Sequence, residues 1–406
     1  MTADLDIISL AKLNAQEQRK LQEAWVHIYR LCGIDDKASD ADKKSTVPDL
    51  TAKLRGHLSE QTKSPEAFRE RLWASILADH PDATILRFLR ARKWDVEQAM
   101  IMLVSALGWR GEHHIDDAVI YKGESVAHMP SGKTRSADEE AFLAQYRSGK
   151  SYVRGTDKEG RPVYVIRVRL HDPRLQTPEA MEAYVLHNIE SIKTMLTFPN
   201  DKACLLFDMT GFGLKNMDFH VVKFLVQVFE ARYPETLGVV LIHKAPFVFW
   251  GIWSIIKGWL DPVIASKINF TSSTSHLLNF IEKSQLQRSY GGEDDWEYKY
   301  IEPLPEENSR MQDVEKRTKI QEERNDLARQ FDTHTLAWVA AAAAASSGDK
   351  TEAKAVKEQA DKRLELAQQL RANYWKLDPY IRARTYYHRA GVVGSGGEVD
   401  FRAARA

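Results

Sequence analysis

The feature that most constrains this chain is an unusually aromatic stretch at residues 245–270, with the sequence APFVFWGIWSIIKGWLDPVIASKINF. It contains three tryptophans, three phenylalanines and five isoleucines. Charged residues and prolines interrupt it at Pro246, Lys257, Asp261 and Pro262. A helix that spans a bilayer needs about 20 nearly uninterrupted apolar residues. The stretch is therefore expected to remain within the fold or at a membrane surface.

Helical periodicity sorts this stretch into two unequal faces. The wide apolar face contains Phe249, Ile252, Trp253, Ile256, Trp259 and Leu260. The narrow stripe opposite it contains Gly251, Ser254, Lys257, Gly258 and Asp261, and Trp250 falls beside Lys257 on this side. One interpretation is an ordinary core helix. The other is a movable lid over an apolar cavity, with Trp250 and Lys257 at a membrane interface.

Composition argues against some classes of protein and is compatible with a large hydrophobic core. The 406 residues are enough for two or three domains, and 43% of them are hydrophobic. Lys plus Arg equals Asp plus Glu at 57 each, which argues against recruitment to nucleic acid by bulk charge. Two cysteines, Cys32 and Cys204, make no disulfide framework, so a reduced, cytosolic protein is expected.

The N-terminal part predicts helices on either side of a weakly ordered segment. Residues 1–31 have the apolar spacing of an amphipathic helix, and residues 33–64 are rich in Asp, Lys, Ser and Thr, which predicts a linker of low order. We treat residues 1–64 as one segment. Residues 65–115 predict a small helical domain, with Ser64 and Pro65 at its first helix start and Asp82 and Asp95 as further candidate N-caps.

Residues 139–295 alternate predicted strands with predicted helices. Strands are expected near 151–154, 163–169, 203–208, 237–243 and 267–271. A hairpin turn at Gly155–Gly160 is expected to join the first two. Intervening helices are expected at 178–196 and 219–233, so the sheet should be mainly parallel. A five-stranded sheet does not need Trp250, Trp253 and Trp259 all buried in it. The surplus of aromatic side chains predicts an internal cavity.

Residues 309–390 predict a long helical hairpin followed by a basic, aromatic tail. The two helices are expected over 315–345 and 350–375, with a break at 346–349. The segment from Tyr380 to His388 is expected to pack back on the body of the protein. No Gly-x-Ser-x-Gly elbow, metal-spaced His/Cys cluster or complete phosphate-binding loop occurs in the chain. We therefore expect neither an enzyme nor a metal site.

Several motifs in register resemble the CRAL-TRIO lipid-binding family. Residues 85–94 (ILRFLRARKW) resemble the signature of its helical N-terminal domain, and residues 157–164 (DKEGRPVY) resemble the hairpin that enters its lipid-binding domain. Residues 233–238 (YPETLG), 244–249 (KAPFVF) and 260–267 (LDPVIASK) resemble its core. The resemblance covers about residues 65–292 and is strongest to the fungal phosphatidylinositol-transfer branch.

This resemblance implies a pocket for one phospholipid under a gate helix, with the gate at about residues 247–260. It implies that Arg92, Glu235 and Lys267 bind the inositol phosphate head group. The predicted pocket and gate residues are Tyr164, Ala203, Leu205, Phe229, Phe247, Phe249, Ile252, Trp253, Ile256, Trp259 and Leu260. Two cations and one carboxylate suit a phosphodiester and inositol hydroxyls, because Arg and Lys donate and Glu accepts.

One departure from the family concerns the second ligand. Members that bind phosphatidylcholine use hydroxyl side chains where this chain has Val153, Ala203, Leu205 and Phe229, with Tyr164 retained. This departure argues against phosphatidylcholine as the second ligand. Our hypothesis is that a more apolar lipid, such as a sterol or a polyisoprenoid, suits Ala203, Leu205 and Phe229 better. No other cofactor is expected.

Two functions are compatible with these patterns. In the first, the protein transfers phosphatidylinositol between membranes or presents it to a lipid kinase. In the second, it is a lipid-sensing adaptor whose C-terminal hairpin recruits a protein. The first is favoured. It implies a monomeric, cytoplasmic protein that binds transiently to the surface of the Golgi, endoplasmic reticulum or endosome and does not bind nucleic acid.

Overall fold

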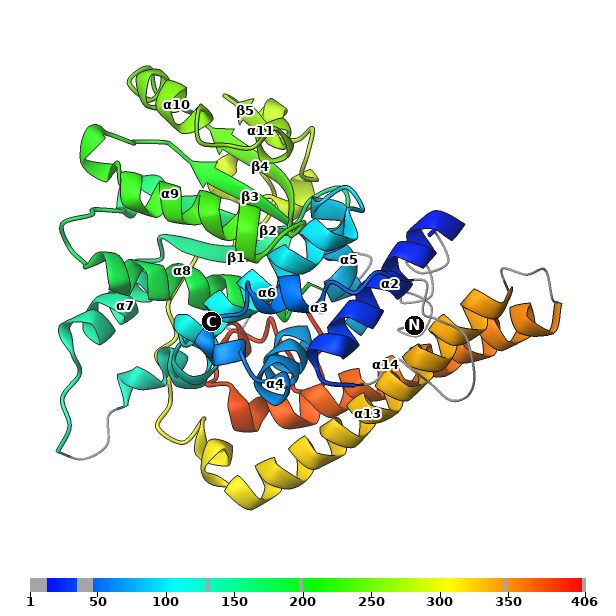
Figure 1. Ribbon diagram of the computed structural model, residues 1–406. Coiled ribbons are helices and arrows are strands. Elements are labelled where there is room, and N and C mark those ends of the chain that lie inside the picture. Colours follow the sequence, from blue (N-terminus) through cyan, green and yellow to red (C-terminus); the bar gives the residue numbers. More distant parts are fainter. Residues whose placement is uncertain (1–12, 35–46, 129–131, 197–199, 346–349, 404–406) are drawn as a thin grey trace. The chain divides into compact units, whose positions relative to one another are not determined.

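The computed structural model describes residues 13–34, 47–128, 132–196, 200–345 and 350–403 (Figure 1). The chain forms two compact units, each built from segments that are distant in sequence. The helical unit comprises residues 1–116 and 313–380, and the sheet unit comprises residues 117–312 and 381–406. The C-terminal hairpin and its tail are predicted from the sequence as one domain, residues 309–390. In the structure the hairpin belongs to the helical unit and the tail to the sheet unit.

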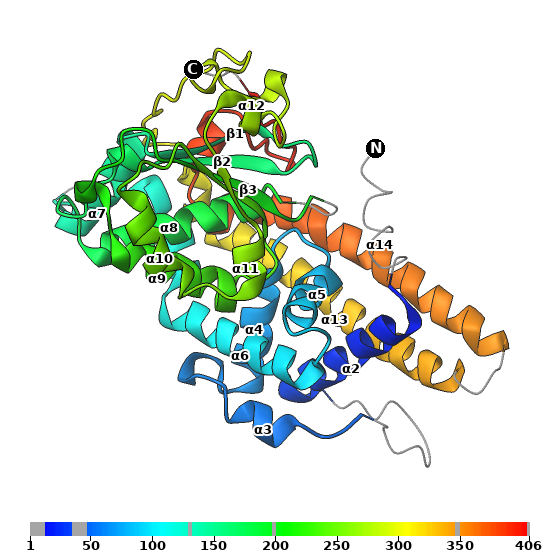
Figure 2. The same ribbon diagram turned by 90° about the horizontal axis from the view of Figure 1, so that it is seen from above.

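The helical unit packs N-terminal helices against the C-terminal hairpin. Its helices are α2 (Ala15–Leu31), α3 (Thr51–Arg55), α4 (Pro65–Ile76), α5 (Pro81–Ala91), α6 (Val96–Glu112), α13 (Val314–Ala345) and α14 (Lys350–Ile381). Figures 1 and 2 show α13 and α14 side by side, as the sequence predicts. The predicted break at 346–349 and the residues before Leu13 lie outside the described residues, as does the 35–46 part of the predicted linker.

One continuous core explains why the hairpin joins this unit. Phe331 and Leu370, from the two hairpin helices, are almost completely buried together with Trp25 of α2 and Phe68 of α4. The ring of Phe331 lies 5.7 Å from that of Trp25. The hairpin's apolar face is therefore buried within the unit, together with the charged side chains of Arg324, Asp332 and Arg363.

Two of the three predicted helix starts are confirmed. Ser64 Oγ accepts from the backbone N–H of Ala67 at 3.1 Å, and Asp95 Oδ1 accepts from that of Gln98 at 3.0 Å. The prediction that Asp82 is an N-cap is wrong. His80 is the N-cap of α5, because Pro81 takes the first helical position.

Asp82 instead forms a buried ion pair in the helical unit. Its Oδ1 atom accepts from Arg363 Nη2 at 2.5 Å and from Trp25 Nε1 at 2.7 Å. Burial is the largest single influence on the pKa of Asp82 and would raise it, but the charges of Arg363 and His80 and the hydrogen bonds from Arg363 and Trp25 together lower it below its ordinary value. The pair links α2, α5 and α14 at the centre of the unit.

The sheet unit is built on five strands in the order β1-β2-β3-β4-β5. They are β1 (Ser151–Thr156), β2 (Pro162–Arg167), β3 (Ala203–Asp208), β4 (Leu237–His243) and β5 (Ile268–Thr271). The β1–β2 pair is antiparallel, and the other three pairs are parallel. The predicted hairpin and the mainly parallel sheet are thus confirmed. The helices of this unit are α7 (Ala137–Arg147), α8 (Pro178–Lys193), α9 (Phe219–Gln227), α10 (Phe249–Lys257), α11 (Pro262–Ser266), α12 (Thr274–Leu277) and α15 (Tyr386–Arg389).

The two faces of the sheet are covered differently. Figure 2 shows α12 on one side of β1–β3 and α8, α9 and α10 on the other. On the α12 side, Val165, Cys204 and Leu241 pack tightly against Leu277 and neighbouring apolar residues. Because side chains alternate along a strand, Tyr164, Leu205 and Val240 point to the opposite side. That second face borders the cavity described below.

The tail packs on the sheet unit, as predicted for the segment up to His388. Tyr386 and Tyr387 are buried, and the ring of Tyr386 lies 4.9 Å from that of Tyr298. The guanidinium of Arg389 pairs with Glu124 and, at 2.9 Å, with Glu307. Burial raises the pKa of Glu124 above its ordinary value, although Arg389 opposes this.

The buried ion pair predicts the response of the helical unit to Asp82→Asn. Removing one charge leaves Arg363 buried without its carboxylate, which typically costs about 3–5 kcal/mol. We expect urea denaturation followed by far-ultraviolet circular dichroism to show a loss of about 3 kcal/mol in the free energy of unfolding. Glu358→Gln removes an exposed partner of Lys362 on the same hairpin and should change it by less than about 0.5 kcal/mol. Equal effects of the two substitutions would contradict this account.

Candidate functional site

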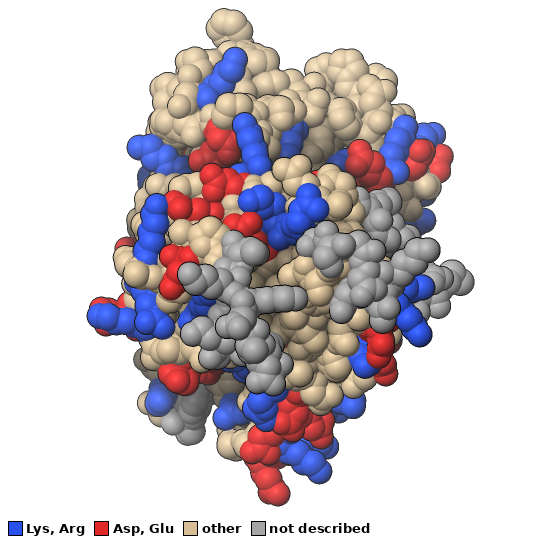
Figure 3. Space-filling model, turned by 45° about the vertical axis from the view of Figure 1, so that its right-hand side comes forward, with Lys and Arg blue, Asp and Glu red and all other residues tan. Residues whose placement is uncertain are grey.

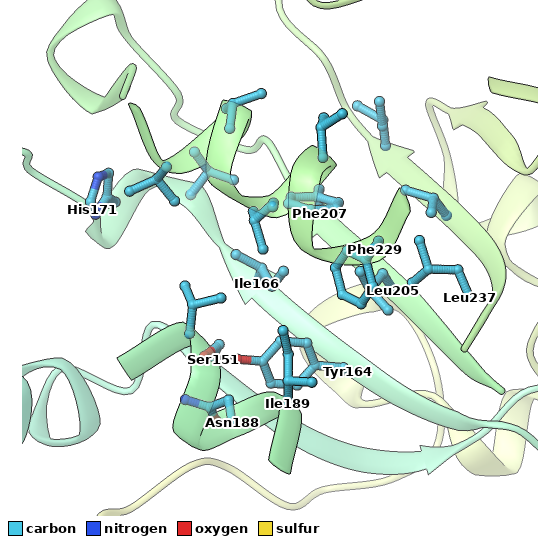
Figure 4. A pocket seen from close by; sticks show the side chains of 18 of the residues that line it. Ser151, Tyr164, Ile166, His171, Asn188, Ile189, Leu205, Phe207, Phe229 and Leu237 are labelled. Atoms are coloured by element: carbon cyan, nitrogen blue, oxygen red, sulfur yellow. Dashed lines mark hydrogen bonds between the residues drawn. The ribbon is translucent and has the colours of Figure 1, made fainter. Parts of the chain in front are cut away.

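An apolar cavity of about 270 Å³ lies between the sheet and its covering helices. Its floor is the face of the sheet opposite α12, and its wall comes from α8, α9 and α10. The floor residues are Tyr164, Ile166, Ala203, Leu205, Phe207, Val240 and Ile242, and the wall includes Met181, Val185, Ile189, Ile192, Val221, Leu225, Phe249, Trp253 and Ile256. Figure 4 shows side chains from strands and helices pointing into this space. The cavity inferred from the aromatic surplus is therefore present.

Most of the predicted pocket residues border this cavity. Those that line it are Tyr164, Ala203, Leu205, Phe229, Phe249, Trp253, Ile256 and Leu260. Phe249, Trp253 and Ile256 recur at helical spacing, so the apolar periodicity located the inner face of α10. Ile252 is buried beside them in a cluster with Met209, Phe212 and Ile242, and does not line the cavity.

Two predicted pocket residues lie elsewhere. Phe247 is 93% exposed, because it belongs to the turn that precedes α10 rather than to the helix. Trp259 follows the end of α10 and packs on α9, with its ring 5.8 Å from that of Phe219 and 4.9 Å from Lys223 Nζ. Of the residues predicted for the pocket and gate, Phe247, Ile252 and Trp259 therefore do not line the cavity.

The outer side of α10 exposes both residues predicted to contact a membrane. Trp250 is 46% exposed and its ring lies 4.7 Å from that of Phe270, while Lys257 is exposed near the end of the helix. Further large apolar side chains are exposed nearby in the chain: Phe247, Val248, Ile255 and Val263. The exposure of Ile255 is not predicted by the helical periodicity, which assigns only small or polar residues and Trp250 to the outer side of this helix. Figure 3 shows that the surface around α10, α11 and β5, at the top of the view, carries few charges.

A second part of the site is a charged cluster at one edge of the sheet. Lys202, Glu235 and Lys267 each lie just before a parallel strand, and such residues gather at the amino edge. Glu235 Oε2 lies 3.1 Å from Lys202 Nζ and 3.9 Å from Lys267 Nζ. The cluster carries two cations and one carboxylate, and the charge of Asp261 also acts on Lys267. The two ammonium groups can donate hydrogen bonds to an anion.

Lys267 is the more buried of the two lysines. Burial lowers its pKa, and the negative charge of Glu235 opposes this shift. An anion beside Lys267 would have the same stabilising effect as Glu235. Lys202 was not predicted, because a single lysine before a strand has no distinctive sequence signal.

Arg92, the third predicted head-group residue, belongs to the helical unit. It follows the last residue of α5, and its side chain is exposed. The structure therefore brings Glu235 and Lys267 together, whereas a role for Arg92 beside them stays a prediction.

A row of hydroxyl groups interrupts the apolar lining of the cavity. Ser151 Oγ lies 2.5 Å from the Tyr164 hydroxyl (Figure 4). It also lies 2.6 Å from the Tyr184 hydroxyl. Burial raises the pKa of both tyrosines, so both remain neutral at physiological pH. These groups satisfy one another, which lets them border an apolar ligand without a large desolvation cost.

The described residues contain neither a metal-ligand cluster nor a membrane-spanning helix. No group of three or more His, Cys, Asp or Glu side chains in this part of the chain could hold a metal ion. No described helix is long and apolar enough to cross a bilayer.

Comparison with known proteins identifies the family. The model of the CRAL/TRIO domain matches residues 146–292, and that of the CRAL/TRIO N-terminal domain matches residues 51–105. A CRAL-TRIO domain-containing protein of Schizosaccharomyces pombe is 34% identical, with 94% of this chain and 91% of that protein aligned. The phosphatidylinositol transfer protein CSR1 of Eremothecium gossypii is 37% identical, with 91% and 81% aligned. The Sec14 cytosolic factor of S. pombe is 28% identical, with 52% and 74% aligned.

Proposed function

Since the chain belongs to the CRAL-TRIO family, we propose that it binds one phosphatidylinositol molecule and transfers it between membranes. The observation that carries this proposal is the combination of an apolar cavity with a cationic cluster. Acyl chains would occupy the cavity under α10, and the head group would lie at Lys202, Glu235 and Lys267. The name of the CSR1 relative supports the choice of phosphatidylinositol.

The head-group cluster suits this ligand chemically. Lys267 and Lys202 donate hydrogen bonds to the phosphodiester, and Glu235 accepts from an inositol hydroxyl. The carboxylate also keeps the two ammonium groups from repelling each other when the site is empty. Arg92 is a further phosphate donor in this proposal, on the basis of its motif.

Lipid exchange requires α10 to move, because its residues Phe249, Trp253 and Ile256 line the cavity. The helix has only 9 residues and is bounded by the turn at Phe247 and by Gly258. Its outer face carries Trp250, which suits a bilayer interface. Contact of this face with the membrane would stabilise an open position of the helix and allow the lipid to exchange.

The same site suits a second, more apolar ligand. Ala203, Leu205 and Phe229 line the cavity and offer no hydroxyl to a choline phosphate head group. A sterol or a polyisoprenoid would fit this wall better. In this proposal the protein is a carrier rather than an enzyme, acts in the cytoplasm at endomembrane surfaces, and can present its lipid to a lipid kinase.

Lys267→Ala tests the head-group assignment. A hydrogen bond to a charged group contributes about 1.5–3 kcal/mol, so we expect phosphatidylinositol transfer between vesicles to fall at least about tenfold. Lys283→Ala removes an exposed lysine that pairs with Glu293, and should leave transfer unchanged. Undiminished transfer by Lys267→Ala would rule out the proposed contact.

Trp250→Ala tests the membrane-facing role of α10. Losing the partial burial of one indole at the interface costs about 1 kcal/mol, so vesicle binding in a flotation assay should weaken about fivefold. Transfer should fall in parallel, while the amount of lipid carried by the purified protein stays the same. Leu304→Ala removes another exposed apolar side chain and serves as the control. If both variants bind vesicles equally well, Trp250 does not contact the membrane.

A further inference from the structure

A buried ammonium group borders the cavity away from the head-group cluster. Lys150 immediately precedes β1, is only 5% exposed, and lines the cavity together with His171 and Asp218. In Figure 4, His171 lies at one end of the lining and Leu237, the first residue of β4, lies at the other. Since Glu235 precedes β4 by two residues, Lys150 and the head-group cluster are associated with different ends of the cavity.

Three side chains form a connected polar group at this end. Lys150 Nζ lies 3.1 Å from His171 Nδ1, and His171 Nε2 lies 3.0 Å from Asp218 Oδ2. An ammonium can only donate and a carboxylate can only accept, so the imidazole must accept at Nδ1 and donate from Nε2. Burial and the adjacent Lys150 lower the pKa of His171, which agrees with this neutral form.

Other hydrogen bonds hold this group in place. Asn216 Nδ2 donates to the backbone carbonyl of His171 at 2.7 Å. Asp218 Oδ1 caps α9 by accepting from the backbone N–H of Val221 at 3.1 Å. The positions of His171 and Asp218 are thus set by the backbone, and Lys150 is aligned by them.

The charge of Lys150 is not balanced by a direct partner. No Asp or Glu among the described residues forms an ion pair with it, and Asp218 is reached only through the imidazole. The other nearby acid, Asp172, already binds Arg174 at 2.7 Å. Burial lowers the pKa of Lys150 to about 8, so most of the molecules carry the charge at pH 7. A buried charge of this kind needs a paired anion to offset its desolvation.

We propose that Lys150 binds the carboxylate of a long-chain fatty acid whose hydrocarbon chain lies in the cavity. Its hydrogen bond to His171 uses one of three N–H groups, which leaves two for carboxylate oxygens. A carboxylate carries a single charge and matches a single ammonium. A phosphate monoester would bring a further negative charge close to Asp218. This inference rests on the proposed function in one respect: the fatty acid would occupy the same cavity as the acyl chains of phosphatidylinositol.

Fluorescent cis-parinaric acid and its methyl ester test this site on the full-length protein after bound lipid has been removed. We expect the unmodified protein to bind the acid at least about tenfold more tightly than the ester at pH 7. In Lys150→Met, which keeps the length of the side chain, the two should bind equally. Lys150→Arg should restore a preference for the acid, and Lys267→Ala should keep it.

The outcomes separate this inference from the proposed function. Equal binding of acid and ester by the unmodified protein would overturn the inference whether or not any variant folds, and so would a preference for the acid that persists in Lys150→Met. Transfer of phosphatidylinositol by the unmodified protein is measured in the same preparation. A preference for the acid without such transfer would discard the proposed function and keep the fatty-acid site.

Discussion

The sheet unit depends on one constraint: α8, α9 and α10 cover one face of the sheet without filling the space above it. Protein interiors normally pack as densely as organic crystals, and an internal void loses contacts on every side. Here most of the surface that borders the void is apolar, and its polar groups gather in a few places, such as Lys150 with His171 and Asp218. A ligand that fills the space stabilises the unit by the free energy of its binding. The fold is therefore suited to carrying an apolar molecule.

Parallel topology determines where one cluster of charged side chains gathers. Residues that precede parallel strands gather at one edge, and this brings Lys202, Glu235 and Lys267 together from three separate segments. Lys150, His171 and Asp218 form a second polar group in the cavity lining. The apolar part of a lipid and its polar head thus find different surroundings within one unit.

Sequence patterns predicted the strands, the hairpin and the inner face of α10, because alternation and helical periodicity directly reflect burial. They failed where the end of a helix depends on a neighbouring residue. Pro81 takes the first position of α5, so His80 rather than Asp82 is the N-cap. Because α10 ends at Lys257, Trp259 packs on α9 instead of lining the cavity. Lys150 and Lys202 were missed because a single lysine has the same pattern whether it is solvated or buried. Glu235 and Lys267 were found through family motifs, and no periodicity would have distinguished them.

Native mass spectrometry of the purified protein, with identification of the released lipid, shows directly whether the chain carries phosphatidylinositol. We expect one phosphatidylinositol per chain, and loss of that species from Lys267→Ala but not from the control Lys283→Ala. A protein that carries no lipid, and takes up none from vesicles that contain phosphatidylinositol, would contradict this expectation.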